Sequence, residues 1–209
     1  MIRREDRSIS GLNAQAVTGL KDLAKTCAKG ACGDLATFLG IPIGLADTEC
    51  LYPPMYQVVE RRTVRSPKSL IIIASDVKGV GRSRMVLILN KDDSTKLVDR
   101  HRSVPHHEGR PLVEEDKTAL AEISGQMISK FMDPLQHHLP SDFQITPPVV
   151  THDAIRGRAV PPKLSKLMSG YQLMMEVHFI DRSKRVRGGI IFLPDEDLRQ
   201  KLTEGLGNK

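Results

Sequence analysis

Apolar residues recur every three or four positions in two long stretches of the chain, and each stretch is followed by short apolar runs. The first stretch, from Leu12 to Leu39, has the spacing of an amphipathic helix, and Gly40 supplies a stop. Shorter elements are expected after it in this order: strands at 41–51, 58–64 and 69–76, a glycine turn at 79–81, a strand at 85–89 and a helix at 92–101.

The second half of the chain repeats this order. A helix is expected from Glu114 through Leu139, with a stop at Pro140. The elements expected after it are a strand at 143–150 interrupted by Pro147 and Pro148, an irregular basic segment at 152–166, strands at 171–181 and 188–193, and a helix at 195–206. Strand, turn, strand and acidic helix start therefore follow each long helix.

The two halves also match position by position. Six residues of the first long helix have identical or similar residues about 100 positions later, without a gap: Thr18, Leu20, Asp22, Leu23, Leu35 and Leu39 against Thr118, Leu120, Glu122, Ile123, Leu135 and Leu139. We therefore predict an internal duplication within a single domain, 1–209. Repeat one is expected at about 12–101, the linker at about 102–111 and repeat two at about 112–206.

This duplication predicts a layered α/β (α+β) fold. Two long helices are expected on one face of a continuous, mainly antiparallel sheet, related by pseudo-two-fold symmetry. The chain begins with charged residues, and no apolar segment follows them, so no signal peptide is expected. No run approaches the roughly 18 apolar residues that span a membrane. A cytoplasmic protein without membrane contact is the resulting expectation.

Composition narrows the class of partner. The formal net charge of +6 favours acidic partners in general. Three tyrosines, five phenylalanines and no tryptophan leave few rings on which single-stranded nucleic acid could stack. The densest basic cluster, within 61–68, is interpreted as solvated loop charge. Nucleic-acid binding thus rests on charge alone, and we do not expect it.

Sulfur-containing and histidine side chains indicate core packing more than chemistry. Three cysteines lack the paired spacing of a zinc site and are expected to be buried free thiols: Cys27, Cys32 and Cys50. Four methionines are expected to fill the core beneath the helices: Met127, Met132, Met174 and Met175. Three histidines near the linker have no acidic or cysteine partner at ligand spacing, so no metal site is expected: His101, His106 and His107.

The duplicated helix strings, Leu20 to Gly40 and Leu120 to Leu139, resemble those of the CheC, CheX and FliY phosphatases of chemotaxis. The resemblance covers nearly the whole chain, including the strand, glycine turn, strand and acidic helix of each half. It implies the CheC-like fold, which the middle domain of the flagellar switch protein FliM shares. It also implies a partner, the phosphorylated receiver of a CheY-like response regulator, and allows a homodimer.

In that family the phosphatase site on the repeat helix has an Asp or Ser, a Glu, an Asn and a distant Pro. The second repeat resembles this pattern at Thr118, Glu122, Gly125 and Pro148, and the Asn is missing. The first repeat has Thr18, Asp22, Lys25 and Thr48 at these places, so only a shortened acid remains. The resemblance implies that Glu122 acts catalytically with Thr118, and that Asp22 and Pro148 contact the partner.

Loss of the Asn matters because its amide holds the attacking water in line in that family. The receiver itself carries the phosphoryl group and Mg²⁺, so this chain needs no cofactor of its own and supplies only orientation. Gly125 has no side chain for this task. Gln126 follows on the same helix face and has an amide, so it is the candidate replacement.

Two hypotheses from different classes follow. The chain is either an aspartyl-phosphate phosphatase acting on a response regulator, or a non-catalytic binding module that contacts a response regulator or a flagellar switch component. The absence of the Asn from both repeats favours the module. Phosphate release from phosphorylated receivers discriminates the two.

Overall fold

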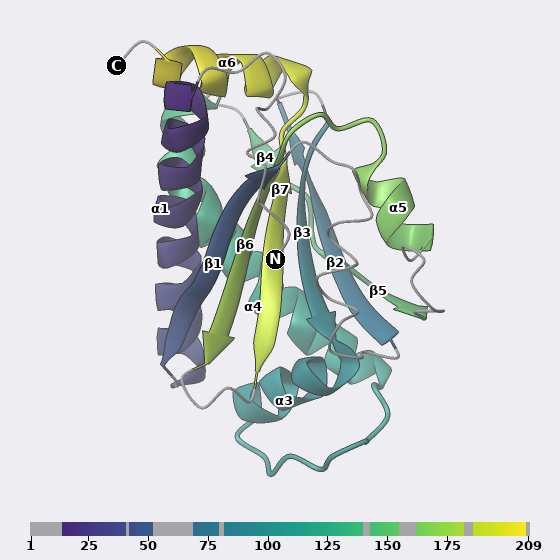
Figure 1. Cartoon of the computed structure of the whole chain (residues 1–209). Coiled ribbons are helices and arrows are strands. Elements are labelled where there is room, and N and C mark those ends of the chain that lie inside the picture. Colours follow the sequence, from purple (N-terminus) through teal and green to yellow (C-terminus); the bar gives the residue numbers. More distant parts are fainter. Residues whose placement is uncertain are drawn as a thin grey trace, which may run out of the picture.

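The chain forms a seven-stranded sheet with helices against both of its faces and across both of its ends (Figure 1). The computed structural model describes residues 14–40, 42–51, 69–79, 82–139, 143–154, 162–181 and 186–207. Its helices are α1 (Ala14–Leu39), α3 (Lys91–His101), α4 (Glu114–Met132), the 3-10 helix η1 (Asp133–His138), α5 (Pro162–Met168) and α6 (Glu196–Gly207). Its strands are β1 (Ile43–Leu51), β2 (Ser69–Lys78), β3 (Ser83–Asn90), β4 (Gln144–Ile145), β5 (Val149–Ala154), β6 (Met174–Asp181) and β7 (Arg187–Leu193).

The strand order is symmetric about the centre of the sheet. Strands β7 and β3 lie in the middle; β6 and then β1 follow on one side, and β2 and then β5 on the other. Every pairing is antiparallel. The first strands of each half thus pair with a strand of the other half: β1 pairs with β6, and both β4 and β5 pair with β2. The expected antiparallel sheet is confirmed, and this order is the one a duplicated chain would give.

The two long helices meet at positions about 100 residues apart in the sequence. A Cβ added at Gly30 of α1 would lie 3.1 Å from the backbone oxygen of Lys130 of α4. Such an approach is closer than most Cβ contacts, so glycine lets the helix backbones come together there. Together with the strand order, this contact supports an internal duplication, which stays a prediction about the origin of the chain.

The main core lies between the sheet and the two long helices. Ile71, Leu87, Val177 and Phe192 point into it from four strands, and their alternate neighbours point to the opposite face. There a smaller cluster forms, in which Leu70, Ile72 and Ile88 of the strands pack with Leu164 and Met168 of α5.

The sulfur-containing side chains occupy these cores. Cys27 and Cys32 are buried and free, as expected, whereas the side chain of Cys50 lies outside the described part. Burial raises the pKa of both buried thiols to about 12, so they stay protonated. All four methionines are buried, but Met174 belongs to the cluster under α5 and not to the core beneath the helices. Its neighbour Met175 points the other way because side chains alternate along a strand.

Most expected elements are present, and two need correction. The long helix expected to run through Leu139 ends at Met132 and continues as η1, because Pro134 has no N–H with which to continue the α-helical pattern. Part of the segment expected to be irregular, 152–166, is regular: β5 extends to Ala154, and α5 begins at Pro162. Asp153 caps this helix by accepting a hydrogen bond from the backbone N–H of Lys163 at 2.9 Å.

The strand expected at 58–64 and the basic cluster within 61–68 lie outside the described residues. Among the described helices, none has the length and apolar character needed to cross a membrane.

Candidate functional site

The helix face predicted to carry the chemistry is exposed on α4. We call Thr118, Glu122, Gly125 and Gln126 the α4 face. Thr118 and Glu122 are exposed, while Gly125 and Gln126 are half-buried. The helix turns this face outward because its apolar residues, at spacings of three and four, face the core on the other side: Leu120, Ile123, Met127, Ile128 and Phe131.

Pro148 lies against the middle of the α4 face. A Cβ added at Gly125 would lie 3.7 Å from Cγ of Pro148, an ordinary van der Waals distance. Pro148 follows Pro147 in the segment between β4 and β5, where the pairing with β2 is interrupted, since proline cannot donate a hydrogen bond to a neighbouring strand. The fold therefore brings Pro148 to the position where the amide is missing, and leaves room there for a side chain.

The acid of the α4 face contacts a residue of the first half. Oε2 of Glu122 lies 3.4 Å from Nε2 of His101, the last residue of α3. The imidazole of His101 stacks on the ring of Phe38 in α1, with ring centroids 4.8 Å apart and planes inclined by 24°. Three helices thus meet at Glu122, which remains 57% exposed.

The other candidate side chains lie around this acid. Oγ1 of Thr118 donates a long hydrogen bond, 3.4 Å, to the backbone oxygen of Glu114. Its hydroxyl is therefore directed along its own helix. Gln126 follows Glu122 by four positions, so the two side chains are neighbours on the helix surface. The side chain of Gln126 belongs to the α4 face, but it leaves the helix about 100° around the axis from the position of Gly125.

A buried ion network fixes the start of α4 to α3. Arg110 of the linker donates to Asp99 of α3 at 2.7 Å and to Asp116 of α4 at 2.6 Å. Arg102 donates to Asp116 at 2.9 Å, and Nδ1 of His106 lies 2.8 Å from Asp99. Both carboxylates are buried, so the linker is tied to both halves where α4 begins.

These contacts control the charge of the two carboxylates. Burial raises the pKa of Asp99 and Asp116, but hydrogen bonds from Arg110 outweigh it, assisted by His106 at Asp99 and by the backbone N–H of Val113 at Asp116. The pKa of each therefore lies below its ordinary value, and both are ionised at neutral pH. The hydrogen bond from Val113 to Asp116, 3.0 Å long, also satisfies a backbone donor at the start of α4.

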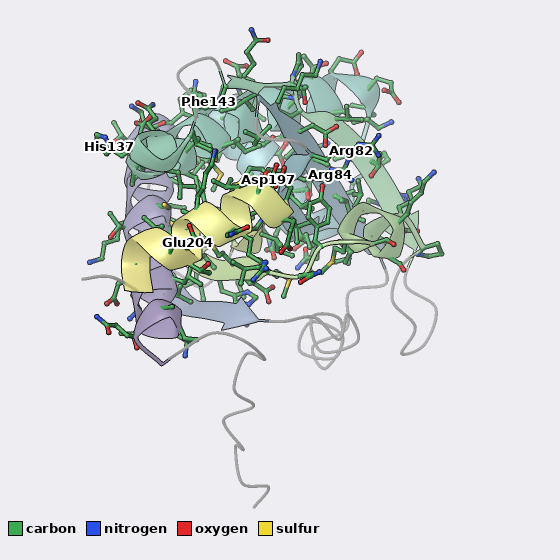
Figure 2. The ribbon with its side chains drawn as sticks, turned by 90° about the horizontal axis from the view of Figure 1, so that it is seen from above. Arg82, Arg84, His137, Phe143, Asp197 and Glu204 are labelled. Carbon is green, nitrogen blue, oxygen red and sulfur yellow. The ribbon has the colours of Figure 1, made fainter. Side chains whose placement is uncertain are left out.

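The corresponding face of α1, which we define as Thr18, Asp22 and Lys25, has different surroundings. Oδ1 of Asp22 pairs with Nζ of Lys25 in its own helix at 3.6 Å, and both side chains are more than half exposed. The end of α6 lies over this helix (Figure 2). Leu206 packs so closely there that a Cβ added at Gly19 would lie 3.0 Å from its Cβ.

Sequence reasoning missed His101 and Phe38 as parts of the site. The sequence singles out His101 only as a possible metal ligand, and Phe38 lies unnamed within the helix expected from Leu12 to Leu39. Within the described residues, no three His, Cys, Asp or Glu side chains gather as a metal site would require. The signal that could have found His101 is its position at the end of the short helix, which the predicted symmetry brings to the long helix of the other half.

Comparison with known proteins shows what fold this chain has. No protein-family model and no curated protein sequence matches it. Among solved structures, FliY of Thermotoga maritima matches with a TM-score of 0.68 at 16% identity, covering 95% of this chain and 99% of that one. The FliM middle domain of H. pylori matches with a TM-score of 0.59 at 12% identity, covering 92% and 99%.

A third match bears on partners of this fold. A chain in the CheX–CheY–BeF3–Mg²⁺ complex of Borrelia burgdorferi matches with a TM-score of 0.54 at 12% identity, covering 84% of this chain and 99% of that one. All three identities are low, so they establish a common fold and no more. The chain has the fold of FliY, CheX and the FliM middle domain, as the repeat-helix resemblance implied.

Proposed function

We propose that this chain is a chemotaxis or two-component signalling protein whose α4 face binds the phosphorylated receiver domain of a response regulator. One observation carries the proposal: Glu122 and Pro148, which are far apart in sequence, lie on the same exposed face around Gly125. An exposed acid on a rigid helix can pair with a lysine of the partner. The solved complex of CheX with CheY supports a receiver as the partner for this fold.

Binding without catalysis is the form of this function that the α4 face supports best. The receiver supplies the phosphoryl group and its Mg²⁺, so acceleration requires a group that holds water in line for attack. Gly125 supplies no such group. We infer that the chain recognises a receiver and leaves the lifetime of its aspartyl phosphate unchanged.

A second candidate is an active phosphatase that uses Gln126. It is favoured by the half-buried position of Gln126 beside Glu122 on the same helix. One additional methylene gives Gln a longer reach than Asn, which could offset its different starting direction. In this case Glu122 and Thr118 would orient the partner, and the amide of Gln126 would hold the water.

The test uses phosphorylated receiver domains from the organism that encodes this protein. Affinity and the decay rate of the aspartyl phosphate are measured with the whole chain and with the variants Glu122→Ala and Gln126→Ala. We expect binding that Glu122→Ala weakens, with an unchanged decay rate. Faster decay that Gln126→Ala abolishes would instead establish the phosphatase. Absence of binding to every receiver would refute both, and a flagellar switch component would then be the partner to test, as the likeness to FliM suggests.

A further inference from the structure

His101 places its imidazole Nε2 3.4 Å from the carboxylate of Glu122, the acid of the α4 face, which is close enough for an ion pair when the imidazole is protonated. It belongs to the first half of the chain, whereas Glu122 belongs to the second. Its side chain is 21% exposed, so the imidazole borders the solvent beside the carboxylate. A partner that reaches Glu122 must therefore also meet the surroundings of His101.

The place of His101 is fixed from two directions. Its ring stacks on Phe38, which is itself packed against the main core. The neighbouring Arg100 donates hydrogen bonds to the backbone oxygens of Leu39 at 3.2 Å and Gly40 at 3.4 Å. The end of α3 is thereby joined to the end of α1, and the imidazole is held at a defined position.

A glutamate on a helix surface otherwise has many side-chain conformations, and binding must select one of them at an entropic cost. The contact with His101 restricts Glu122 before a partner arrives. Because both groups are partly exposed, the pair is weak and can be exchanged for a stronger contact with a partner cation. Among the described residues of the first half the contacts differ: Asp22 pairs with Lys25 of its own helix, and the α6 end contributes Leu206.

We propose that His101 is a positioning residue of the receiver-binding surface, holding the carboxylate of Glu122 outward with Phe38 as its platform. This inference rests on the proposed function. His101 forms no bond to the phosphoryl group and acts through Glu122. It makes the binding surface a joint product of both halves, α1 and α3 from the first and α4 from the second.

The first readout needs no partner. Side-chain ¹⁵N–¹H spectra of the whole protein are recorded for the wild type, Glu122→Gln and Phe38→Leu, and His101 is assigned with His101→Gln. Both substitutions should move the His101 imidazole resonances, through loss of the carboxylate charge and of the ring current respectively. The exposed His107 serves as the internal control and should not move. Unmoved His101 resonances in Glu122→Gln would overturn the inference.

The second readout is affinity for a CheY-like receiver domain activated with beryllofluoride and Mg²⁺. His101→Ala should weaken binding on the order of fivefold, and His101→Gln, which keeps an N–H donor at similar reach, should restore most of it. Added to Glu122→Ala, His101→Ala should have no further effect, and His107→Ala alone should have none.

The two readouts separate the possible failures. If Glu122→Ala weakens binding but His101→Ala does not, the positioning role is wrong and the proposed function stands. If the wild type binds no receiver, the proposed function is wrong, and the resonances alone decide whether His101 positions Glu122.

Discussion

The exposed faces of α1 and α4 have equivalent places in the two halves of the sequence, yet their contacts differ. On α4, Glu122 is paired across the halves with His101. On α1, Asp22 is paired within its own helix with Lys25, and an apolar residue, Leu206, packs nearby at Gly19. In each half the end of a short helix reaches the long helix of the other half. The end of α3 brings the imidazole of His101 to α4, whereas the end of α6 brings the aliphatic side chain of Leu206 to α1.

Two halves with the same order of elements therefore carry different chemistry on their exposed helices. A lysine at the place of the missing amide neutralises Asp22 locally, whereas Gly125 leaves the acid of α4 available to a partner. The start of α4 is also tied down by buried ion pairs through Arg110. A functional side chain needs a rigid support, and α4 provides it.

The largest expected effect comes from removing the support of α4. Arg110→Ala leaves Asp99 and Asp116 buried without their main partner, which typically costs about 3–5 kcal/mol. Denaturant unfolding measures the change. The matched control is Lys117→Ala, which removes an exposed pair with Glu114 and should cost under about 1 kcal/mol. Equal effects of the two substitutions would show that the network does not anchor the helix.

The same network predicts how stability depends on pH. Because the native pKa of Asp99 and Asp116 lies below the unfolded value of about 3.9, these groups stabilise the fold above that pH. Their contribution is lost as pH falls through the native values. Asp93 acts oppositely: burial raises its pKa to about 6, so its ionisation destabilises the fold, and stability rises as pH falls from 7 toward 5.

Unfolding free energies measured between pH 3 and 7 check the direction of both effects, that of Asp99 and Asp116 and that of Asp93. Below about pH 4, the free energy of unfolding should fall more steeply for the wild type than for Arg110→Ala. The variant already lacks the Arg110 contacts that favour ionised Asp99 and Asp116, so protonating these acids removes less stability from it. Asp93→Asn should reduce the rise in the free energy of unfolding that accompanies a fall in pH from 7 to 5. Parallel curves for the wild type and Arg110→Ala would contradict the assignment.

Substitutions of Glu122 in α4 and of Asp22 in α1 test whether the two exposed helix faces differ in binding. Glu122→Ala should weaken binding of an activated receiver about tenfold, equivalent to about 1.4 kcal/mol, because the outward carboxylate is lost. Asp22→Ala should change the affinity less than about twofold, because Lys25 already neutralises that acid. A larger loss of affinity in Asp22→Ala than in Glu122→Ala would show that the receiver binds α1 instead.

The smallest effects concern the crossing of the two helices. A Cβ added at Gly33 in α1 would have no neighbour within 4 Å, so Gly33→Ala should stabilise the protein by about 0.5–1 kcal/mol. Gly30→Ala gains the same helix propensity but places its Cβ 3.1 Å from the backbone oxygen of Lys130. We expect this variant to be less stable than Gly33→Ala by thermal unfolding. Equal stabilisation would show that the helices can move apart freely.

Much of the fold could be predicted from local pattern. The spacing of apolar residues predicts α1 to within a few residues. The acidic first turn predicts the start of α3 to within one residue. The predicted boundaries are wrong where a short stretch of sequence is compatible with more than one kind of structure. Pro134 ends α4 early, and the apolar residues Leu164, Leu167 and Met168 form α5 within a segment that reads as basic and irregular.

The site was predictable only in part, for a different physical reason. Glu122 and Gly125 share a face by helix geometry, so sequence spacing places them. Pro148 followed from the family resemblance alone. The predicted symmetry could have placed the end of the short helix, and so His101, near the long helix of the other half. Its contacts with Glu122 and Phe38 could not be predicted, because contacts between three helices depend on how those helices pack.

Whether the α4 face lacks only its water-holding amide is decided by the decay of a receiver's aspartyl phosphate, measured with the wild-type chain and with Gly125→Asn. Pro148 leaves ordinary space for a side chain at this position, so the variant should fold and place an amide beside Glu122. We predict that the wild type binds without changing the decay, whereas Gly125→Asn accelerates it. Acceleration by the wild type, or none by a variant that still binds, would contradict a binding surface that lacks only its water-holding amide.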